Sequence, residues 1–145
     1  MPVAQEFTVY LEDRAGTLGK ICRKLADHGV NILALHSFPS GEKSVTRFIV
    51  DNPEAAKSAL DGERLTLTLS DVLLLKVQNR PGEIARVAAR LGEADININY
   101  AYCGLESRTN NPLVFFGVSV SEVSRAAQIL EQDAAARSAA TSRTW

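Results

Sequence analysis

One segment of the chain returns sixty-six residues later in the same register. Residues 13–18 read Asp-Arg-Ala-Gly-Thr-Leu, and residues 79–84 read Asn-Arg-Pro-Gly-Glu-Ile. The apolar positions behind the first segment, such as Ile21 and Leu25, recur at the same spacing. A duplicated unit places the same turn twice in one fold. The 145 residues therefore divide into two units of about seventy residues. Each is too small to bury much of its surface alone, so we expect a shared sheet or core.

Hydropathy periods predict the order of elements in the first unit. Apolar and polar residues alternate in strand-like runs, and two stretches carry apolar residues at helical spacing. The expected strands are 7–11, 30–35, 45–50 and 65–69, and the expected helices follow the turn at 13–16 and Pro53. This β-α-β-β-α-β order indicates a ferredoxin-like α+β fold, with an antiparallel sheet and helices on one face.

The second unit replays this order. We expect its first strand at 72–77 and its second at 96–98, which mirrors 30–32. Beyond that point the spacing grows to seventy residues, and the extra residues fall in a polar loop at 104–112. The predicted units are 5–69 and 71–133. The tail, 134–145, is rich in alanine and serine, and it could form a fourth strand, extend the preceding helix or fray.

Several leucines are expected on the sheet face that the helices leave uncovered. Strict alternation places Leu33 and Leu35 there in the first unit and Leu74 in the second. A sheet with helices on one side has to cover such residues. The pattern favours self-association as a homodimer or a higher oligomer over a set of scattered exposed leucines.

Composition narrows the class of protein. A net charge of −1 gives no basic footprint for nucleic acid or anionic membrane. No apolar run approaches the length of a membrane span, and the polar start of the sequence leads us to expect no signal peptide. Cys22 and Cys103 are too far apart in sequence to suggest a motif, which favours a reduced, cytoplasmic setting. His28 and His36 have no ligand-rich neighbourhood, so we expect no metal.

The two strand-to-helix turns are the best candidates for binding. Gly16 and Gly82 allow a sharp bend, and the first N–H groups of a helix are free to hold a carboxylate or phosphate. Asn31 and Asn97 lie eighteen residues beyond Asp13 and Asn79. A carboxamide can donate and accept, so it suits the zwitterion of a free amino acid. The residues alone leave a plainer alternative open, in which the glycine only bends the chain and the asparagine only caps a strand.

The repeated pattern resembles the ACT domain, in tandem, over roughly residues 5–133. It consists of a strand, an Asn/Asp-Arg-Pro/Ala-Gly-x-Leu/Ile turn, and a helix that ends before Val/Ile-Asn-Ile. ACT domains are regulatory modules that bind small ligands, mostly amino acids, at interfaces between paired domains. Carried over by position, the resemblance implies ligand contacts from Asp13, Arg14, Ala15, Gly16, Thr17, Leu18 and Asn31, and from Asn79, Arg80, Pro81, Gly82, Glu83, Ile84 and Asn97.

The chain departs from the family pattern at three positions. Serine-binding members carry a histidine two residues before the turn asparagine, where this chain has Leu11 and Val77. Ala15 replaces the usual proline, and Asp13 replaces the asparagine that the second copy keeps as Asn79. An extra carboxylate attracts an ammonium group and repels a carboxylate, so we expect the two sites to differ.

Three functions follow from this sequence. The first is a non-catalytic sensor that binds an amino acid and acts by allosteric or oligomeric change. The second is a regulatory subunit that docks on a metabolic enzyme, with weak or vestigial ligand sites. The third is a small acylphosphatase-like enzyme using Arg14 and Arg80, although the glycine-rich phosphate loop of such enzymes is missing. We assign no catalytic residue and expect no cofactor.

Overall fold

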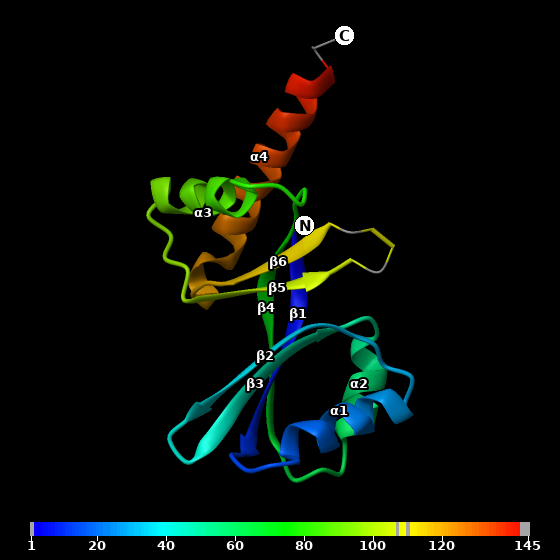
Figure 1. Ribbon diagram of the computed structural model, residues 1–145. Helices are drawn as coiled ribbons and strands as arrows, with labels where there is room; N and C mark the ends of the chain where they lie inside the picture. The colour runs from blue at the N-terminus through cyan, green and yellow to red at the C-terminus, as the bar shows by residue number, and fades with distance from the viewer. Residues whose placement is uncertain (1, 107, 110, 143–145) are drawn as a thin grey trace. The chain divides into compact units, whose positions relative to one another are not determined.

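The chain forms two compact units (Figure 1). The structure is a computed structural model that describes residues 2–106, 108–109 and 111–142. The first unit comprises Gln5–Ser70, and the second comprises the described residues before Gln5 and from Asp71 onward. Within this described part, no helix has both the length and the apolar character needed to cross a bilayer.

The first unit has the predicted ferredoxin-like order. Its elements are β1 (Val3–Glu12), α1 (Thr17–Asp27), β2 (Ile32–Ser40), β3 (Lys43–Val50), α2 (Pro53–Leu60) and β4 (Thr66–Lys76). The strand order is β2-β3-β1-β4, and β3 runs antiparallel to both of its neighbours. The side chain of Asn52 caps α2 by accepting a hydrogen bond from the Ala55 N–H at 3.1 Å. The predicted α+β fold class is confirmed.

The second unit borrows its outer strand from the start of the chain. Its own elements are the end of β4, α3 (Glu83–Glu93), β5 (Tyr100–Leu105), β6 (Pro112–Gly117), the 3-10 turn η1 (Val120–Glu122) and α4 (Val123–Ser142). Beside β4, the Leu74 N–H donates to the Pro2 carbonyl at 2.9 Å. The strand order within this unit is therefore β1-β4-β6-β5, with the fourth-strand position filled by residues before Gln5.

Two expected element boundaries differ in the structure, and the tail takes one of the forms left open for it. The separate strands predicted at 65–69 and 72–77 form the single strand β4. The strand expected to start near Ile96 begins only at Tyr100. Of the three possibilities for the tail, the structure shows extension of the helix, because α4 continues to Ser142. No turn signal separates residues 69 and 72, so the strand has no reason to stop there.

Each unit packs its helices on one face of its strands. In the first unit the core joins strand residues to the apolar stripe of α1 and to α2, and the rings of Phe7 and Phe48 stack with centroids 5.1 Å apart. Leu25 is 1% exposed, and burial of such a leucine contributes about 2 kcal/mol. The second core is built from Leu73, Leu75, Val77, Val87, Leu91, Ile96, Val114, Phe116, Ala126, Ala127 and Leu130.

The prediction that Leu35 lies on the uncovered face is wrong. Leu35 pairs with Phe48 across the β2–β3 ladder and packs against the helix-covered core. The register shifts between Ile32 and Ala34, and such an irregularity reverses the alternation of side chains. Leu74 does lie on the face without helices, since it pairs with Phe115 while its neighbours enter the core.

The ring of Tyr100 lies over Gly117 on the adjacent strand. A Cβ built at Gly117 would fall 2.1 Å from the Tyr100 ring, whereas one built at Gly92 would meet nothing within 4 Å. We expect Gly117→Ala to lower the free energy of unfolding by about 1–3 kcal/mol, as overpacking does. Gly92→Ala, in the last turn of α3, should leave stability unchanged or raise it by roughly 0.5–1 kcal/mol. Urea unfolding of both variants measures the contrast, and equal stabilities would contradict the packing.

Candidate functional site

The first turn, residues 13–18, bends at a left-handed glycine. Gly16 has φ 89° and is the N-cap of α1. The first helical hydrogen bond runs from the Lys20 N–H to the Gly16 carbonyl at 3.0 Å, and no side chain caps the helix start. The Thr17 N–H has only a long contact, 3.4 Å, to the Arg14 carbonyl. The helix therefore begins with N–H groups that can hold an anion.

Two cavities border the first turn. The larger, about 520 Å³, is lined by Arg14, Ala15, Gly16 and Thr17 together with residues of β1, α1 and β3 and the segment before β4. The smaller, about 300 Å³, is lined by Asp13, Arg14, Thr17 and Leu18 with the end of β2. We call the larger one the first-turn cavity. Its volume is typical of pockets that hold small ligands.

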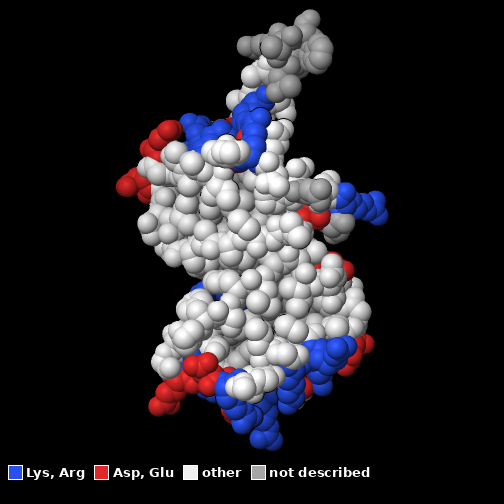
Figure 2. All heavy atoms as spheres, in the orientation of Figure 1, with Lys and Arg blue, Asp and Glu red and all other residues white. Residues whose placement is uncertain are grey.

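The first-turn cavity has a basic lining. Arg14, Lys20, Lys43 and Arg64 face Glu12 and Glu63. Figure 2 shows lysine and arginine side chains gathered over the part of this unit where α1 lies. Both carboxylates already have partners, since Arg14 pairs with Glu12 at 3.0 Å and Lys24 pairs with Glu63 at 2.9 Å. Among the described residues, Lys43 and Arg64 have no ion-pair partner, which leaves the cavity with spare positive charge.

The bond to Lys24 also fixes the ionisation of Glu63. The hydrogen bond from the Lys24 ammonium, and then the charges of Lys24 and Lys20, lower the pKa of the Glu63 carboxyl. Glu63 is therefore ionised at neutral pH. Its negative charge stands beside Lys20, so part of the charge of Lys20 is already balanced within the cavity wall.

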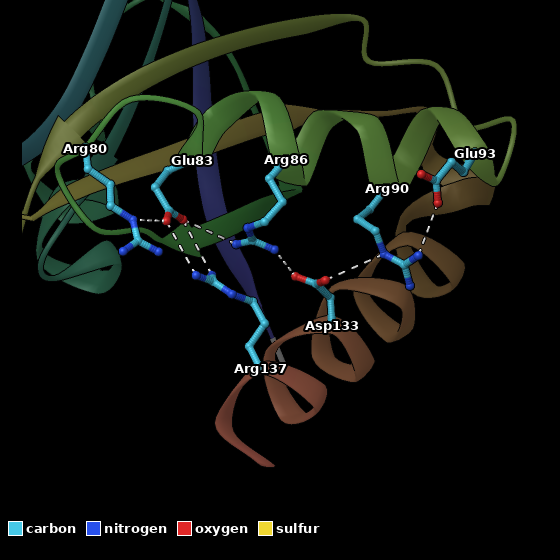
Figure 3. A network of polar contacts seen from close by, with 7 residues as sticks. All are labelled: Arg80, Glu83, Arg86, Arg90, Glu93, Asp133 and Arg137. Carbon is cyan, nitrogen blue, oxygen red and sulfur yellow. Dashed lines mark hydrogen bonds and ion pairs between the residues drawn. The ribbon is translucent and has the colours of Figure 1, made fainter. Parts of the chain in front are cut away.

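The second turn, residues 79–84, has the same backbone conformation at its glycine, but a side chain of the protein lies at the start of its helix. Gly82 has φ 88°, caps α3, and accepts the first helical hydrogen bond from the Arg86 N–H at 2.9 Å. The next residue, Glu83, turns its side chain into a cluster of arginines (Figure 3). The Arg80 Nε donates to Glu83 Oε1 at 2.6 Å, and Arg137 of α4 lies 3.4 Å from the same oxygen.

Glu83 is buried within this cluster. Its side chain is 5% exposed, and Arg86 contacts its other oxygen at 3.5 Å. The hydrogen bond from Arg80 and the charges of Arg137, Arg80 and Arg86 lower the pKa of the Glu83 carboxyl against the opposing effect of desolvation. Arg86 also binds Asp133 of α4. A side-chain carboxylate thus occupies the start of α3.

The two asparagines do not join these cavities. Asn31 is exposed, and its backbone N–H donates to Asp51 Oδ1 at 2.9 Å. Asn97 is also exposed, and its Nδ2 donates to Asn99 Oδ1 at 3.0 Å. Neither residue lines the first-turn cavity or the cavity of about 340 Å³ beside α3 and α4. The structure therefore brings together residues 14–17 around one cavity and leaves Asn31 apart from it.

The remaining candidates from the sequence are a cysteine thiol, possible metal ligands and the polar loop at 104–112. Cys22 is half-buried on α1, and burial raises the pKa of its thiol, which disfavours the reactive thiolate. In the described ranges, no three His, Cys, Asp or Glu side chains are grouped as a metal site requires. The predicted loop at 104–112 includes residues 107 and 110, which lie outside the described residues.

Comparison with protein families matches residues 1–138 to the family described as the ACT domain pair. The chain belongs to this family. The resemblance seen in the paired turns is thereby confirmed, and the left-handed glycines mark the equivalent point in each ACT unit. A comparison with curated proteins found no match.

Solved structures share the paired ACT fold. A protein from Bacteroides thetaiotaomicron is 25% identical, with a TM-score of 0.79 over 91% of this chain and 89% of the other. The ligand-free regulatory subunit of aspartate kinase from Thermus thermophilus is 14% identical, with a TM-score of 0.62 over 91% and 93%. The corresponding subunit from Thermus flavus is 14% identical, with a TM-score of 0.56 over 91% and 96%.

Sequence reasoning missed the distant basic residues that make the surroundings of the two turns different. Lys43 and Arg64 enter the first-turn cavity from β3 and from the segment before β4. Arg137 reaches the second turn from the end of α4. These residues lie 27 to 55 positions from the glycines of the turns they face, and a local motif has no signal for them. Glu83 stood in the predicted set for another reason, as a ligand contact at its motif position.

Strain at the turn glycines can be measured directly. A Cβ at Gly16 or Gly19 would meet nothing within 4 Å, so only the backbone angle separates the two positions. We expect Gly16→Ala to lower the free energy of unfolding by about 1–2 kcal/mol because an L side chain is strained at positive φ. Gly19→Ala, inside α1, should be neutral or stabilise by roughly 0.5–1 kcal/mol. Chemical unfolding compares the pair, and a stable Gly16→Ala variant would contradict the assigned φ.

The buried carboxylate should make stability depend on pH. The folded-state pKa of Glu83 is lowered below its unfolded value of about 4.3. Its stabilising contribution is therefore fully present above that value and disappears as the pH falls through the folded-state pKa. We expect Glu83→Gln to be less stable than the natural protein at neutral pH and to approach it below about pH 4. The exposed Glu93, which pairs with Arg90 at 3.1 Å, supplies the control Glu93→Gln, with a small difference at every pH.

Proposed function

We propose that the chain is a non-catalytic sensor that binds a free amino acid at its ACT turns, with the first turn as the main site. The observation that carries the proposal is the first-turn cavity. It combines the uncapped start of α1 with a basic wall, and these groups suit the carboxylate of a ligand. Asp13 lies at the same turn, lines the adjoining cavity, and supplies an acceptor for the ligand ammonium.

The output of such a sensor is a change of assembly. The proposed sensor is non-catalytic, so a bound ligand has to act by favouring one arrangement of the protein over another. The exposed Leu18 and Ile84 stand at equivalent positions after the two glycines, with 38% and 44% of their surface accessible. They suit contact with a second ACT unit, and a homodimer supplies one.

Calorimetric titration against the twenty amino acids tests the proposal. We expect at least one of them to bind with measurable heat and Gly16→Val to abolish that heat, because a branched residue disturbs the left-handed turn. Gly41→Val is the matched control. Gly41 also has a positive φ, 64°, but it lies in the β2–β3 turn and outside both cavities of the first turn. Flat titrations of the folded protein with all twenty would count against amino-acid sensing.

Docking on a metabolic enzyme is the second candidate. A chain of the same fold and nearly the same extent is the regulatory subunit of aspartate kinase in Thermus thermophilus. At 14% identity this likeness concerns the fold, so the partner of this chain has to be found experimentally. Purification from a native extract should then recover one metabolic enzyme in fixed stoichiometry, with an activity that the chain alters. The natural protein eluting alone would favour the independent sensor.

A further inference from the structure

The two ACT units carry matching charges around their first helices. Arg14 recurs as Arg80, Lys20 as Arg86, and Lys24 as Arg90, each sixty-six residues later. The acidic partner recurs as well, at the seventy-residue spacing. Lys24 pairs with Glu63 at 2.9 Å in the first unit, and Arg90 contacts Asp133 at 3.6 Å in the second. The same basic frame therefore surrounds both turns.

One position among these residues is neutral in the first unit and negatively charged in the second. Thr17 opens α1, and its counterpart Glu83 opens α3. Thr17 borders both cavities of the first turn, and its Oγ1 is buried with no hydrogen-bond partner among the described residues. Glu83 instead places a carboxylate among three guanidinium groups (Figure 3). The basic residues of the first unit thus surround a cavity, whereas those of the second unit surround the Glu83 carboxylate.

We propose that Glu83 is a built-in carboxylate ligand that closes the second ACT turn, so that an external anion binds only at the first turn. The proposal rests on the function proposed above, in which these turns receive the carboxylate of a ligand. It adds that the two turns are not equivalent sites. One chain therefore takes one ligand, and Thr17 and Glu83 decide which turn is open.

A ligand carboxylate at the second turn would have to compete with Glu83 for the same arginines. A ligand carboxylate approaching the start of α3 meets the charge of Glu83, whose oxygens already hold Arg80, Arg86 and Arg137. Like charges at this distance repel, and the guanidinium N–H groups that hold Glu83 are not available to a second carboxylate. At the first turn, Arg14 is exposed and, among the residues that the structure describes, pairs only with the exposed Glu12, so it can turn toward a ligand at small cost.

Helix α4 completes the closure. Arg137 comes from the C-terminal part of this helix, and its two terminal guanidinium nitrogens, Nη1 and Nη2, lie 3.5 and 3.4 Å from the Glu83 oxygens. Asp133, one turn earlier, holds Arg86 in place. The first unit continues into the strand β4 where the second unit has this part of α4, so it has no counterpart of Arg137.

Exchange of the two residues tests the proposal. The probe is inorganic phosphate, and the readout is the backbone amide shift of residues 16–18 and 82–84 in nuclear magnetic resonance spectra, at ionic strength matched with chloride. In the natural protein we expect phosphate to move the signals of 16–18 and to leave those of 82–84 unchanged. Glu83→Thr should make both sets respond. Thr17→Glu should weaken the response at the first turn at least tenfold, and the double exchange should move the response to the second turn.

Two controls isolate closure from other effects. Glu93→Thr removes a carboxylate from the same helix without opening the turn, so it should behave as the natural protein does. Thr17→Glu lies in the other unit, so it remains informative if Glu83→Thr disturbs the fold of α3. The proposal is overturned if residues 82–84 of the natural protein respond as strongly as residues 16–18. It is also overturned if neither turn of the natural protein responds. A folded Glu83→Thr variant whose second turn stays silent overturns it as well.

The outcome separates this proposal from the proposed function. If no amino acid binds but phosphate follows the pattern above, the closed turn stands and amino-acid sensing fails. If an amino acid binds and both turns of the natural protein respond to phosphate, sensing stands and closure by Glu83 fails. Calorimetry of the natural protein gives the same answer through stoichiometry, with about one site per chain expected and two sites contradicting closure.

Discussion

The left-handed glycine at the start of the first helix in each unit is the constraint on which the rest depends. Gly16 and Gly82 have φ values of 89° and 88°, and each accepts the first bond of its helix without a side-chain cap. Most L residues avoid this conformation, so the glycine sets where the helix begins and in which direction it leaves the strand. It also leaves the first N–H groups uncovered. The anion binding proposed for these turns therefore draws first on backbone geometry, before any side chain is considered.

Side chains then separate two turns that share a backbone. In the first unit, Lys43 and Arg64 add positive charge to a cavity that the chain does not fill. In the second, Glu83 supplies the negative charge itself, and it stays ionised because three arginines outweigh the desolvation of its carboxyl. Burial of a charge is costly unless it is paired and hydrogen-bonded, and Glu83 meets both conditions. A duplicated fold can thus hold one receptor for an external anion and one that its own chain satisfies.

The sequence predicts the parts of this fold that are set by local pattern. Alternation and helical spacing identify the elements of both units, and the repeated glycine identifies both turns. What it misses depends on contacts between distant residues. The shift in register between Ile32 and Ala34, which turns Leu35 toward the core, leaves no mark in the alternation of apolar residues. Pairing of Pro2 with Leu74 joins residues more than seventy positions apart, so no local motif predicts the borrowed strand. The cavity residues Lys43 and Arg64 escape the motif for the same reason.

The borrowed strand and the closed turn are linked by one choice of secondary structure. A second ACT unit that followed the first in every element would end in a strand beside β4. Here residues before Gln5 take that place, and the tail is free to continue as α4. A helix carries Asp133 and Arg137 on one face about 6 Å apart, whereas a strand would set them roughly 13 Å apart. That face meets α3, where Asp133 holds Arg86 and Arg137 holds Glu83. A tail that formed a strand would set these two residues too far apart to face Arg86 and Glu83 together, and Glu83 would lose one of the arginines that keep it buried.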